Sequence, residues 1–278
     1  MRTLPYALAL AALAYGAVCA LLYLVQDRLL YLPQAEVARR GATAVRLECG
    51  EATLKLWELH PEQRAAVIYF GGNAEDVSAN LADFDSALPD RAIYLVNYRG
   101  YGGSSGRPSE AALIADAGSV YDWVRLRHEP IAVMGRSLGS GVATALATHR
   151  PIERLILITP YDSIANVAAD HFFWLPVRWL IRDRYDSLAR IGRVHAPVLA
   201  VIAEHDEVVL RARSDALIAA MPSQLRRVVV VAGATHNDIS AFPGYLATLG
   251  EFLRTRPSPP PEALPQSADP RPLTPASW

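Results

Sequence analysis

One nonapeptide, Val133-Met134-Gly135-Arg136-Ser137-Leu138-Gly139-Ser140-Gly141, joins an apolar run at residues 131–134 to a helix-compatible run at residues 138–149. Its centre fits the pattern Gly-x-Ser-x-Gly. A serine on a sharp strand-to-helix turn projects its hydroxyl above the sheet edge, and the flanking glycines leave room where the helix crosses the strand. The pattern predicts that Ser137 is a nucleophile. It also predicts that the amide of Leu138, at the helix start, points at the oxygen of a bound acyl group.

Short apolar, β-branched runs alternate with helix-compatible stretches through most of the chain. The predicted strands lie at residues 65–70, 92–98, 131–134, 155–159, 198–203 and 227–231. The predicted helices lie at residues 77–88, 109–127, 138–149 and 213–220. Before them, residues 44–49 and 53–59 alternate apolar and polar side chains, which predicts an antiparallel hairpin. This order is typical of an α/β fold with a mostly parallel central sheet flanked by helices.

Two further polar residues follow core strands. Asp206 comes after the strand at 198–203, and His236 comes after the strand at 227–231. Because ligands of such sheets gather at the carboxyl ends of the strands, we expect both residues to lie near Ser137. The order Ser-Asp-His is the chain order of an α/β-hydrolase triad. In this interpretation, His236 accepts the serine proton and Asp206 orients the imidazole.

Each of these assignments has rivals nearby in the sequence. His205 adjoins the predicted acid on the same loop, so its reach to the serine is poor. The rival acids are Glu204, Glu207 and Asp238. The loop that begins at Gly71 and Gly72 is either an ordinary turn or a place where backbone N–H groups approach a ligand oxygen.

Composition narrows the function classes. The formal net charge of −1 over 278 residues gives no reason to expect a nucleic-acid partner. Cys19 and Cys49, the two cysteines, do not make a disulfide framework, and both are expected to be unpaired. The loop at 99–106 lacks the lysine of a phosphate-binding loop, and no His/Cys cluster has metal-ligand spacing. We therefore expect neither a metal nor a cofactor.

The N-terminal segment carries a long apolar run. Residues 6–25 contain no charge, and about 20 such residues span a bilayer as a helix. A buried core helix is disfavoured because the run is apolar on every face. A cleaved signal peptide is the alternative, since Ala12-Leu13-Ala14 resembles a small-x-small site, but cleavage there would leave much of the run in place. The interpretation favoured here is an uncleaved single-pass anchor, and Arg2 before it favours an extracytoplasmic or periplasmic catalytic body.

The predicted organisation is an anchor and linker at 1–33, a catalytic body at 34–254 and a proline-rich disordered tail at 255–278. Because no predicted strand precedes residue 44, a chain starting near Gln34 is expected to fold without the anchor.

Within the body, residues 162–195 break the strand–helix rhythm and are dense in aromatics. Such an insertion is typical of a lid, which predicts that Phe172, Phe173 and Trp174 contact substrate. Gly72, in the loop after the strand at 65–70, is also expected to contact substrate. A core-packing helix pair and a stripe resting on a membrane surface are the alternatives.

Taken together, these motifs resemble the α/β-hydrolase superfamily and, within it, the membrane-anchored BEM46-like (ABHD13/ABHD17-like) hydrolases. The resemblance rests on residues 70–74, 97–104, 135–139, 159–163, 196–199 and 236–238, and on the post-anchor stretch 26–33. It implies a hydrolase of esters, thioesters or, less often, amides, acting on a small-molecule or lipid acyl substrate. The family pattern places His-Gly-Asn after the third strand, whereas here Gly71 replaces the histidine. By that pattern the backbone N–H of Asn73 is the second oxyanion donor, beside that of Leu138.

Three functions remain open at this point. The first is a membrane-tethered serine hydrolase of acyl esters or thioesters. The second is a peptidase-like hydrolase that uses the same triad. The third is a catalytically silent relative that binds a lipid or a partner, which the complete Ser-Asp-His set disfavours.

Overall fold

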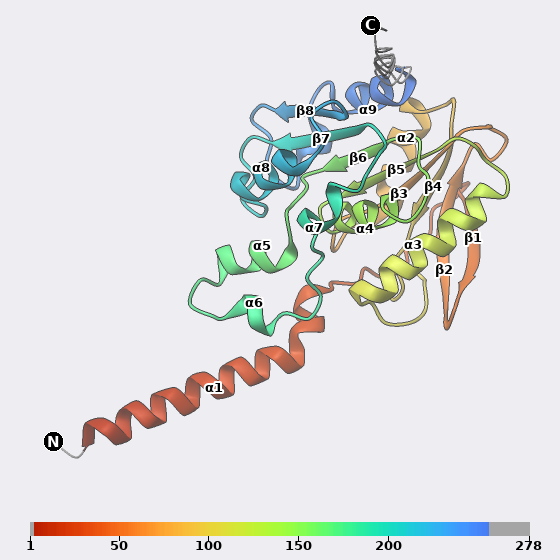
Figure 1. The fold of residues 1–278 in the computed structure, drawn as a ribbon. Coiled ribbons are helices and arrows are strands. Elements are labelled where there is room, and N and C mark those ends of the chain that lie inside the picture. The colour runs from red at the N-terminus through yellow and green to blue at the C-terminus, as the bar shows by residue number, and fades with distance from the viewer. Residues whose placement is uncertain (1–2, 256–278) are drawn as a thin grey trace, which may run out of the picture.

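The computed structural model describes residues 3–255, so the predicted tail, beyond Thr255, lies outside the described residues. Eight strands form one sheet in the order β1-β2-β4-β3-β5-β6-β7-β8 (Figure 1). Their bounds are β1 Thr43–Cys49, β2 Ala52–Leu59, β3 Ala66–Phe70, β4 Ala92–Val96, β5 Ile131–Arg136, β6 Leu155–Ile158, β7 Val198–Ala203 and β8 Arg226–Val231. The pairs β1·β2 and β2·β4 are antiparallel, and all later neighbours are parallel. The predicted hairpin and mostly parallel sheet are confirmed.

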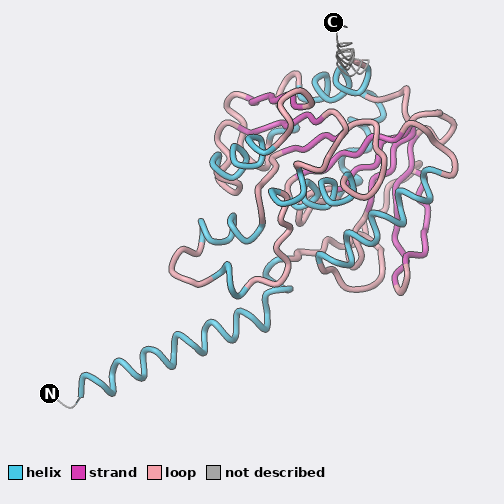
Figure 2. The backbone as a smooth tube through the Cα atoms, in the orientation of Figure 1, coloured by secondary structure: helices cyan, strands magenta, loops and turns pink. Residues whose placement is uncertain are grey.

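Helices cover both faces of this sheet (Figure 2). They are α1 Thr3–Leu30, η1 Val77–Asn80, α2 Leu81–Ala87, α3 Glu110–Arg125, α4 Leu138–Ala147, α5 Ile164–His171, α6 Val177–Leu180, α7 Leu188–Ile191, α8 Arg211–Ala220, η2 Ile239–Ala241 and α9 Tyr245–Arg254. Residues of α3, α4, α7 and α8 belong to the apolar core on one face, and residues of α2 and α9 belong to the core on the other. The sequence pattern did not predict α9.

The central strands explain why the body needs two helical layers. In β3, Ala66, Ile68 and Phe70 belong to one core, whereas Val67 and Tyr69 belong to the other. All five residues are buried. Successive side chains of a strand point to opposite faces, so a continuously apolar strand requires cover on both sides.

A close crossing of α4 over the sheet positions the turn between β5 and α4. Ser137 has φ 48° and ψ −116°, a strained conformation for a residue with a side chain. A Cβ atom on Gly139 would lie 2.0 Å from the carbonyl oxygen of Phe70, and one on Gly135 would lie 2.2 Å from the carbonyl oxygen of Gly139. The glycines therefore permit the backbones of β3, β5 and α4 to touch beneath Ser137.

The N-terminal helix α1 extends away from the body as a single rod (Figure 1). Its stretch Leu4–Leu30 is long and apolar enough to cross a membrane, and its most apolar window is not buried by the rest of the protein. The cysteines Cys19, within α1, and Cys49, in β1, are free, as predicted.

The chain that follows α1 joins the body directly. Tyr31 is only 3% exposed and belongs to the core on the α3–α4 face. Its hydroxyl donates to Asp183 Oδ2 at 2.7 Å and lies 2.9 Å from the hydroxyl of Tyr185. Gln34 also contributes, because its carbonyl accepts from the amide of Gly102 at 2.9 Å. The segment at 27–34 is thus packed against the body, although the sequence assigned most of it to the anchor.

We predict that Gly139→Ala lowers the unfolding midpoint, because the new methyl group meets the backbone carbonyl of Phe70, which cannot move away without distorting β3. The expected cost is about 1–3 kcal/mol, the range for overpacking a core. Gly118→Ala in α3 is the matched control, since its Cβ would meet only a flexible arginine end at 3.7 Å and a helical Gly→Ala change gains about 0.5–1 kcal/mol. Thermal unfolding in detergent compares the three proteins, and equal midpoints would contradict the crossing.

Candidate active site

Three loops at the carboxyl edge of the sheet bring Ser137, Asp206 and His236 together. Ser137 follows β5, Asp206 follows β7 and His236 follows β8. His236 Nε2 lies 2.9 Å from Ser137 Oγ, and His236 Nδ1 lies 2.9 and 2.8 Å from the two carboxylate oxygens of Asp206. With the carboxylate facing Nδ1, that nitrogen carries the proton, so Nε2 accepts from the serine hydroxyl.

Hydrogen bonds from backbone amides hold the carboxylate of Asp206 in place. The amides of Val208 and Val209 donate to Asp206 Oδ1 at 3.0 and 2.7 Å. Only 3% of the Asp206 side chain and 7% of the His236 side chain are exposed. A carboxylate fixed by two amides and removed from water can orient the imidazole and stabilise its protonated form.

The rival residues have other partners. The side chain of His205 is 66% exposed and its Nε2 faces Glu204 at 3.8 Å. Glu204 accepts from the amide of Gly233 at 2.8 Å, Glu207 accepts from the amide of His236 at 3.3 Å, and Asp238 accepts from the amide of Thr235 at 2.7 Å. These three acids bind backbone amides of the loop around His236. Among the four candidate acids, Asp206 is the one whose carboxylate reaches the His236 imidazole.

The loop after β3 also lies close to Ser137. A Cβ atom on Gly72 would lie 3.6 Å from Ser137 Cβ, so the chain passes directly beside Ser137. In residues 3–255 the backbone amide of Asn73 donates to no protein acceptor. The amide of Leu138, at the first residue of α4, is also free of such a partner there. Two unpaired amides flanking a serine are a suitable arrangement for an oxyanion.

Although Gly71 stands where the family has histidine, several hydrogen bonds fix this loop. The carbonyl of Gly71 accepts from the Tyr98 hydroxyl at 2.8 Å. The side chain of Asn73 donates to the carbonyl of Leu30 at 2.7 Å and accepts from the amide of Leu32 at 3.0 Å. The hydroxyl of Tyr101 donates to the same Asn73 oxygen at 2.8 Å. The end of the N-terminal helix is therefore bonded to the loop beside Ser137.

Glu75 and Arg136 connect the loop to the histidine. Glu75 accepts from the amide of Gly72 at 2.5 Å and lies 3.6 Å from the Arg136 guanidinium. Arg136 donates to the carbonyl of His236 at 3.2 Å. Burial acts to lower the pKa of Arg136, but the Glu75 carboxylate and neighbouring phenols outweigh it, and the net pKa is raised. Burial, followed by Glu75, also raises the pKa of Tyr69, whose hydroxyl donates to Glu75 at 2.7 Å.

Sequence reasoning did not identify Glu75, Arg136, Tyr31 or Tyr101 as part of the site. The signal for three of them was the likeness to the family, whose matching stretches 26–33, 97–104 and 135–139 carry Tyr31, Tyr101 and Arg136. For Arg136, the pattern Gly-x-Ser-x-Gly leaves the residue before the serine unspecified. Its role depends on a contact with a loop 100 positions later in the chain.

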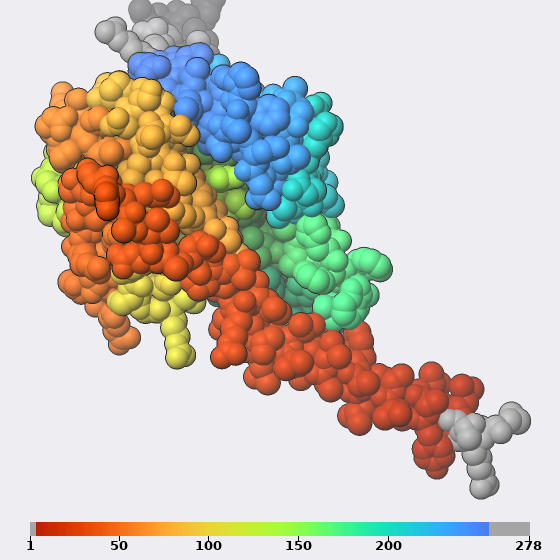
Figure 3. Space-filling view, turned by 180° about the vertical axis from the view of Figure 1, so that it is seen from behind, coloured from red at the N-terminus to blue at the C-terminus, as the bar shows by residue number. Residues whose placement is uncertain are grey.

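The predicted aromatic contacts lie along α1. Phe172 is 49%, Phe173 85% and Trp174 54% exposed. The carbonyl of Trp174 accepts from the hydroxyl of Tyr15 in α1 at 2.9 Å. Figure 3, from behind, shows the insertion lying beside the N-terminal helix. Their contact with substrate stays a prediction.

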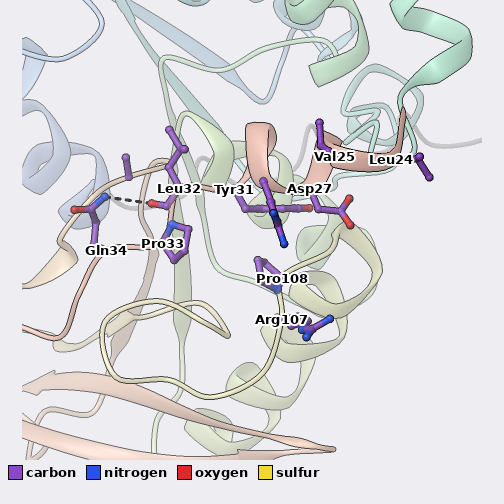
Figure 4. A pocket seen from close by; sticks show the side chains of 11 residues that line it. Leu24, Val25, Asp27, Tyr31, Leu32, Pro33, Gln34, Arg107 and Pro108 are labelled. Carbon is purple, nitrogen blue, oxygen red and sulfur yellow. Dashed lines mark hydrogen bonds between the residues drawn. The ribbon is translucent and has the colours of Figure 1, made fainter. Parts of the chain in front are cut away.

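A cavity of about 840 Å³ opens where α1 meets the body (Figure 4). Its lining includes Leu24 and Arg28 from the helix, Arg107 and Pro108 from the loop before α3, and Ala74 from the loop beside the serine. Ser137, Asp206 and His236 are not among its lining residues, so this cavity adjoins the candidate site without containing it. Within residues 3–255, no group of three or more His, Cys, Asp or Glu side chains is arranged to hold a metal ion.

Comparison with known proteins places these features in a family. Residues 61–183 match the family model described as serine aminopeptidase, S33. The chain is 38% identical over 259 residues to an uncharacterized protein of Mycobacterium tuberculosis, Rv2307c, covering 87% of this chain and 91% of that one. It is 31% identical over 200 residues to human alpha/beta hydrolase domain-containing protein 17C, covering 69% of this chain and 59% of that one.

Solved structures share the fold. The Pyrococcus furiosus esterase Pf2001 superimposes with a TM-score of 0.65 at 18% identity, over 80% of this chain and 98% of that one. The α/β hydrolase GrgF from Penicillium sp. sh18 superimposes with a TM-score of 0.61 at 18% identity, over 76% of this chain and 96% of that one. The sheet order, the serine turn and these likenesses agree, and the chain belongs to the α/β-hydrolase superfamily as a protein similar to the ABHD17 hydrolases.

Proposed function

We propose that this protein is a serine hydrolase that cleaves carboxylic esters or thioesters through Ser137, His236 and Asp206. The observation that carries the proposal is the position of His236, whose two ring nitrogens bridge the serine hydroxyl and the buried carboxylate. Membership of the α/β-hydrolase superfamily and the fold shared with an esterase support the same chemistry.

The reaction would proceed in two halves. Ser137 Oγ attacks the acyl carbon while its proton passes to His236 Nε2. The bond to the leaving alcohol or thiol then breaks, and that group takes the proton from His236. Water next attacks the acyl-enzyme and gives a proton to His236, after which the acid departs and Ser137 recovers its proton. In both halves the amides of Leu138 and Asn73 would stabilise the negative oxygen.

We also propose that α1 anchors the protein to a membrane as a single span, with the body outside the cytoplasm. The length and apolar character of Leu4–Leu30 support an anchor. The division into an anchor and linker at 1–33 and a body at 34–254, with an inserted lid near 162–195, stays a prediction. The burial of Tyr31 favours counting the segment that follows α1 with the body.

An amide-cleaving peptidase on the same three residues is the second candidate, favoured by the description of the matching family model. A panel of p-nitrophenyl esters, thioesters and aminoacyl anilides would rank the three classes by kcat/KM. A clear preference for anilides would replace the proposed substrate class while leaving the catalytic residues in place.

We predict that Ser137→Ala removes labelling by a fluorophosphonate probe and lowers kcat by about 10⁴-fold or more, because the attacking oxygen is lost. Ser140→Ala, three residues further along and buried within α4, is the control and should keep both labelling and turnover. A folded Ser137→Ala protein that hydrolyses esters at the wild-type rate would contradict the nucleophile.

We predict that His236→Ala abolishes ester turnover, whereas His205→Ala keeps most of it, because the exposed His205 faces Glu204. The reverse pattern of losses in the two variants would reassign the base.

We predict that Tyr101→Phe lowers kcat by about tenfold, less than the 10²–10³ of a lost oxyanion donor, because Asn73 loses one of the bonds that fix its backbone amide. Burial raises the pKa of Tyr101 to about 12, so its phenol stays neutral and able to donate. Tyr121→Phe is the matched control, since Tyr121 is equally buried but donates to the carbonyl of Pro151. Equal effects of both variants on kcat would show that Tyr101 acts through stability alone.

A further inference from the structure

The aromatic insertion, defined here as residues 172–181, runs along the N-terminal helix. At one end, the carbonyl of Trp174 accepts from Tyr15 at 2.9 Å. At the other end, the carbonyl of Leu180 accepts from Gln26 at 3.2 Å, and Arg182, just past the insertion, pairs with Asp27 at 2.7 Å. Figures 1 and 3 show the two segments side by side from opposite directions. The insertion therefore lies along the half of α1 nearer the body.

Helix length decides what this contact means in a membrane. Each residue of a helix advances 1.5 Å, and a hydrocarbon core is about 30 Å thick. Residues 3–14, the part of α1 beyond the Tyr15 contact, measure only about 18 Å and cannot cross alone. A span of about 30 Å needs about 20 residues, which extends the buried part to near Leu22 or beyond. If α1 spans the bilayer, the segment around Trp174 must enter the hydrocarbon beside it.

The surface of the insertion suits that environment. Phe173 is 85% and Trp179 89% exposed, and Phe172 and Trp174 are about half exposed. Large aromatic side chains gathered at the surface mark a site of contact with a membrane or a partner. Among bilayer-contacting segments, tryptophan and arginine prefer the boundary with water, where the exposed Arg178 and Arg182 can extend toward head groups.

Backbone polar groups inside hydrocarbon need internal partners, and the insertion has several. The carbonyls of Trp174 and Leu180 use the polar side chains of α1, Tyr15 and Gln26. The short helix α6 closes the amides of Trp179 and Leu180 onto the carbonyl of Pro176. This pairing gives Tyr15 and Gln26, two polar residues of a largely apolar helix, hydrogen-bond partners in the insertion.

We infer that residues 172–181 are embedded in the same bilayer leaflet as the body-proximal half of α1, and that the substrate is a membrane-borne acyl ester. The partner of this surface is a lipid bilayer. The substrate part rests on the proposed function, whereas the embedding rests on α1 spanning the membrane.

Both segments of this membrane-contacting surface reach the candidate site. The insertion follows His171, whose Nε2 lies 2.8 Å from the carbonyl of Val208, on the loop that holds Asp206. The end of α1 is bonded through Leu30 to Asn73, beside Ser137. The loops of the predicted acid and of the oxyanion donor are thus each attached to an element at the bilayer, which sets the site over the membrane surface.

The embedding can be tested by tryptophan quenching in the full-length protein. The protein is reconstituted in phosphatidylcholine/phosphatidylglycerol vesicles that contain lipids brominated either at mid-chain or near the head group. We expect mid-chain bromines to quench wild-type fluorescence, and the Trp174→Phe/Trp179→Phe variant to lose most of that quenching. Trp123→Phe is the control and should keep it, because Trp123 packs against Tyr94 in the body. Quenching that survives in the double variant, or that only head-group bromines produce, would overturn the embedding.

The substrate part has a separate readout. Trp179→Ser should lower kcat/KM on a long-chain ester in vesicles by about tenfold, because the site loses its position over the bilayer. The same variant should stay within about twofold of wild type on a short soluble ester, which reaches the site from bulk water. Equal losses on both substrates would overturn the membrane-borne substrate. Fluorophosphonate labelling of the wild type tests the serine chemistry independently, so a protein that is quenched but unlabelled would fail the proposed function alone.

Discussion

The contact between the backbone of α4 and the end of β3 is the constraint on which the site depends. Gly139 lies so close to the carbonyl of Phe70 that no side chain fits between them. That approach fixes the start of α4, and hence the Leu138 amide, relative to the loop that carries Asn73. The strained φ of Ser137 is a consequence, because the chain must reverse from strand to helix within one residue. The favourable packing of α4, all of whose residues are buried, offsets this strain.

A second constraint comes from outside the hydrolase fold. Asn73 uses its side chain to bind the carbonyl of Leu30 and the amide of Leu32, and its own backbone amide donates to no protein acceptor in residues 3–255. In a chain with glycines at positions 71 and 72, these bonds replace the rigidity that bulkier residues would supply. Tyr31, between the two bonded residues, is buried and reaches the insertion through Asp183 and Tyr185. The segment after α1 is therefore part of the architecture around the site, and a chain that begins at Gln34 would lack it.

Sequence patterns predicted the sheet well because buried parallel strands are short, apolar and evenly spaced. The strand at 198–203 was predicted with the bounds observed for β7. The three loops that carry Ser137, Asp206 and His236 were predictable for the same reason, since parallel strands deliver their carboxyl ends to one edge. What the patterns could not supply were contacts between distant segments. The bond from Arg136 to the His236 carbonyl and the bond from Asn73 to Leu30 leave no local periodicity. The packing of Tyr31 was missed because its neighbours read as a linker.

The placement of α1 and the insertion gives a physical reason for the coupling of anchor and site. A helix attached only by a flexible linker would keep the body near the membrane but leave its orientation free. Here the helix end is bonded to the loop beside the serine, and the insertion is bonded to the helix and follows His171, whose side chain contacts the loop of Asp206. Two attachments on either side of the serine restrict rotation about the helix axis, so the fold would also set the orientation of the site relative to the bilayer in the proposed membrane arrangement. For the proposed membrane-borne substrate, orientation, unlike simple proximity, would let an ester carbonyl at the lipid surface approach one face of the protein repeatedly, which is the condition for the reaction geometry to be reached often.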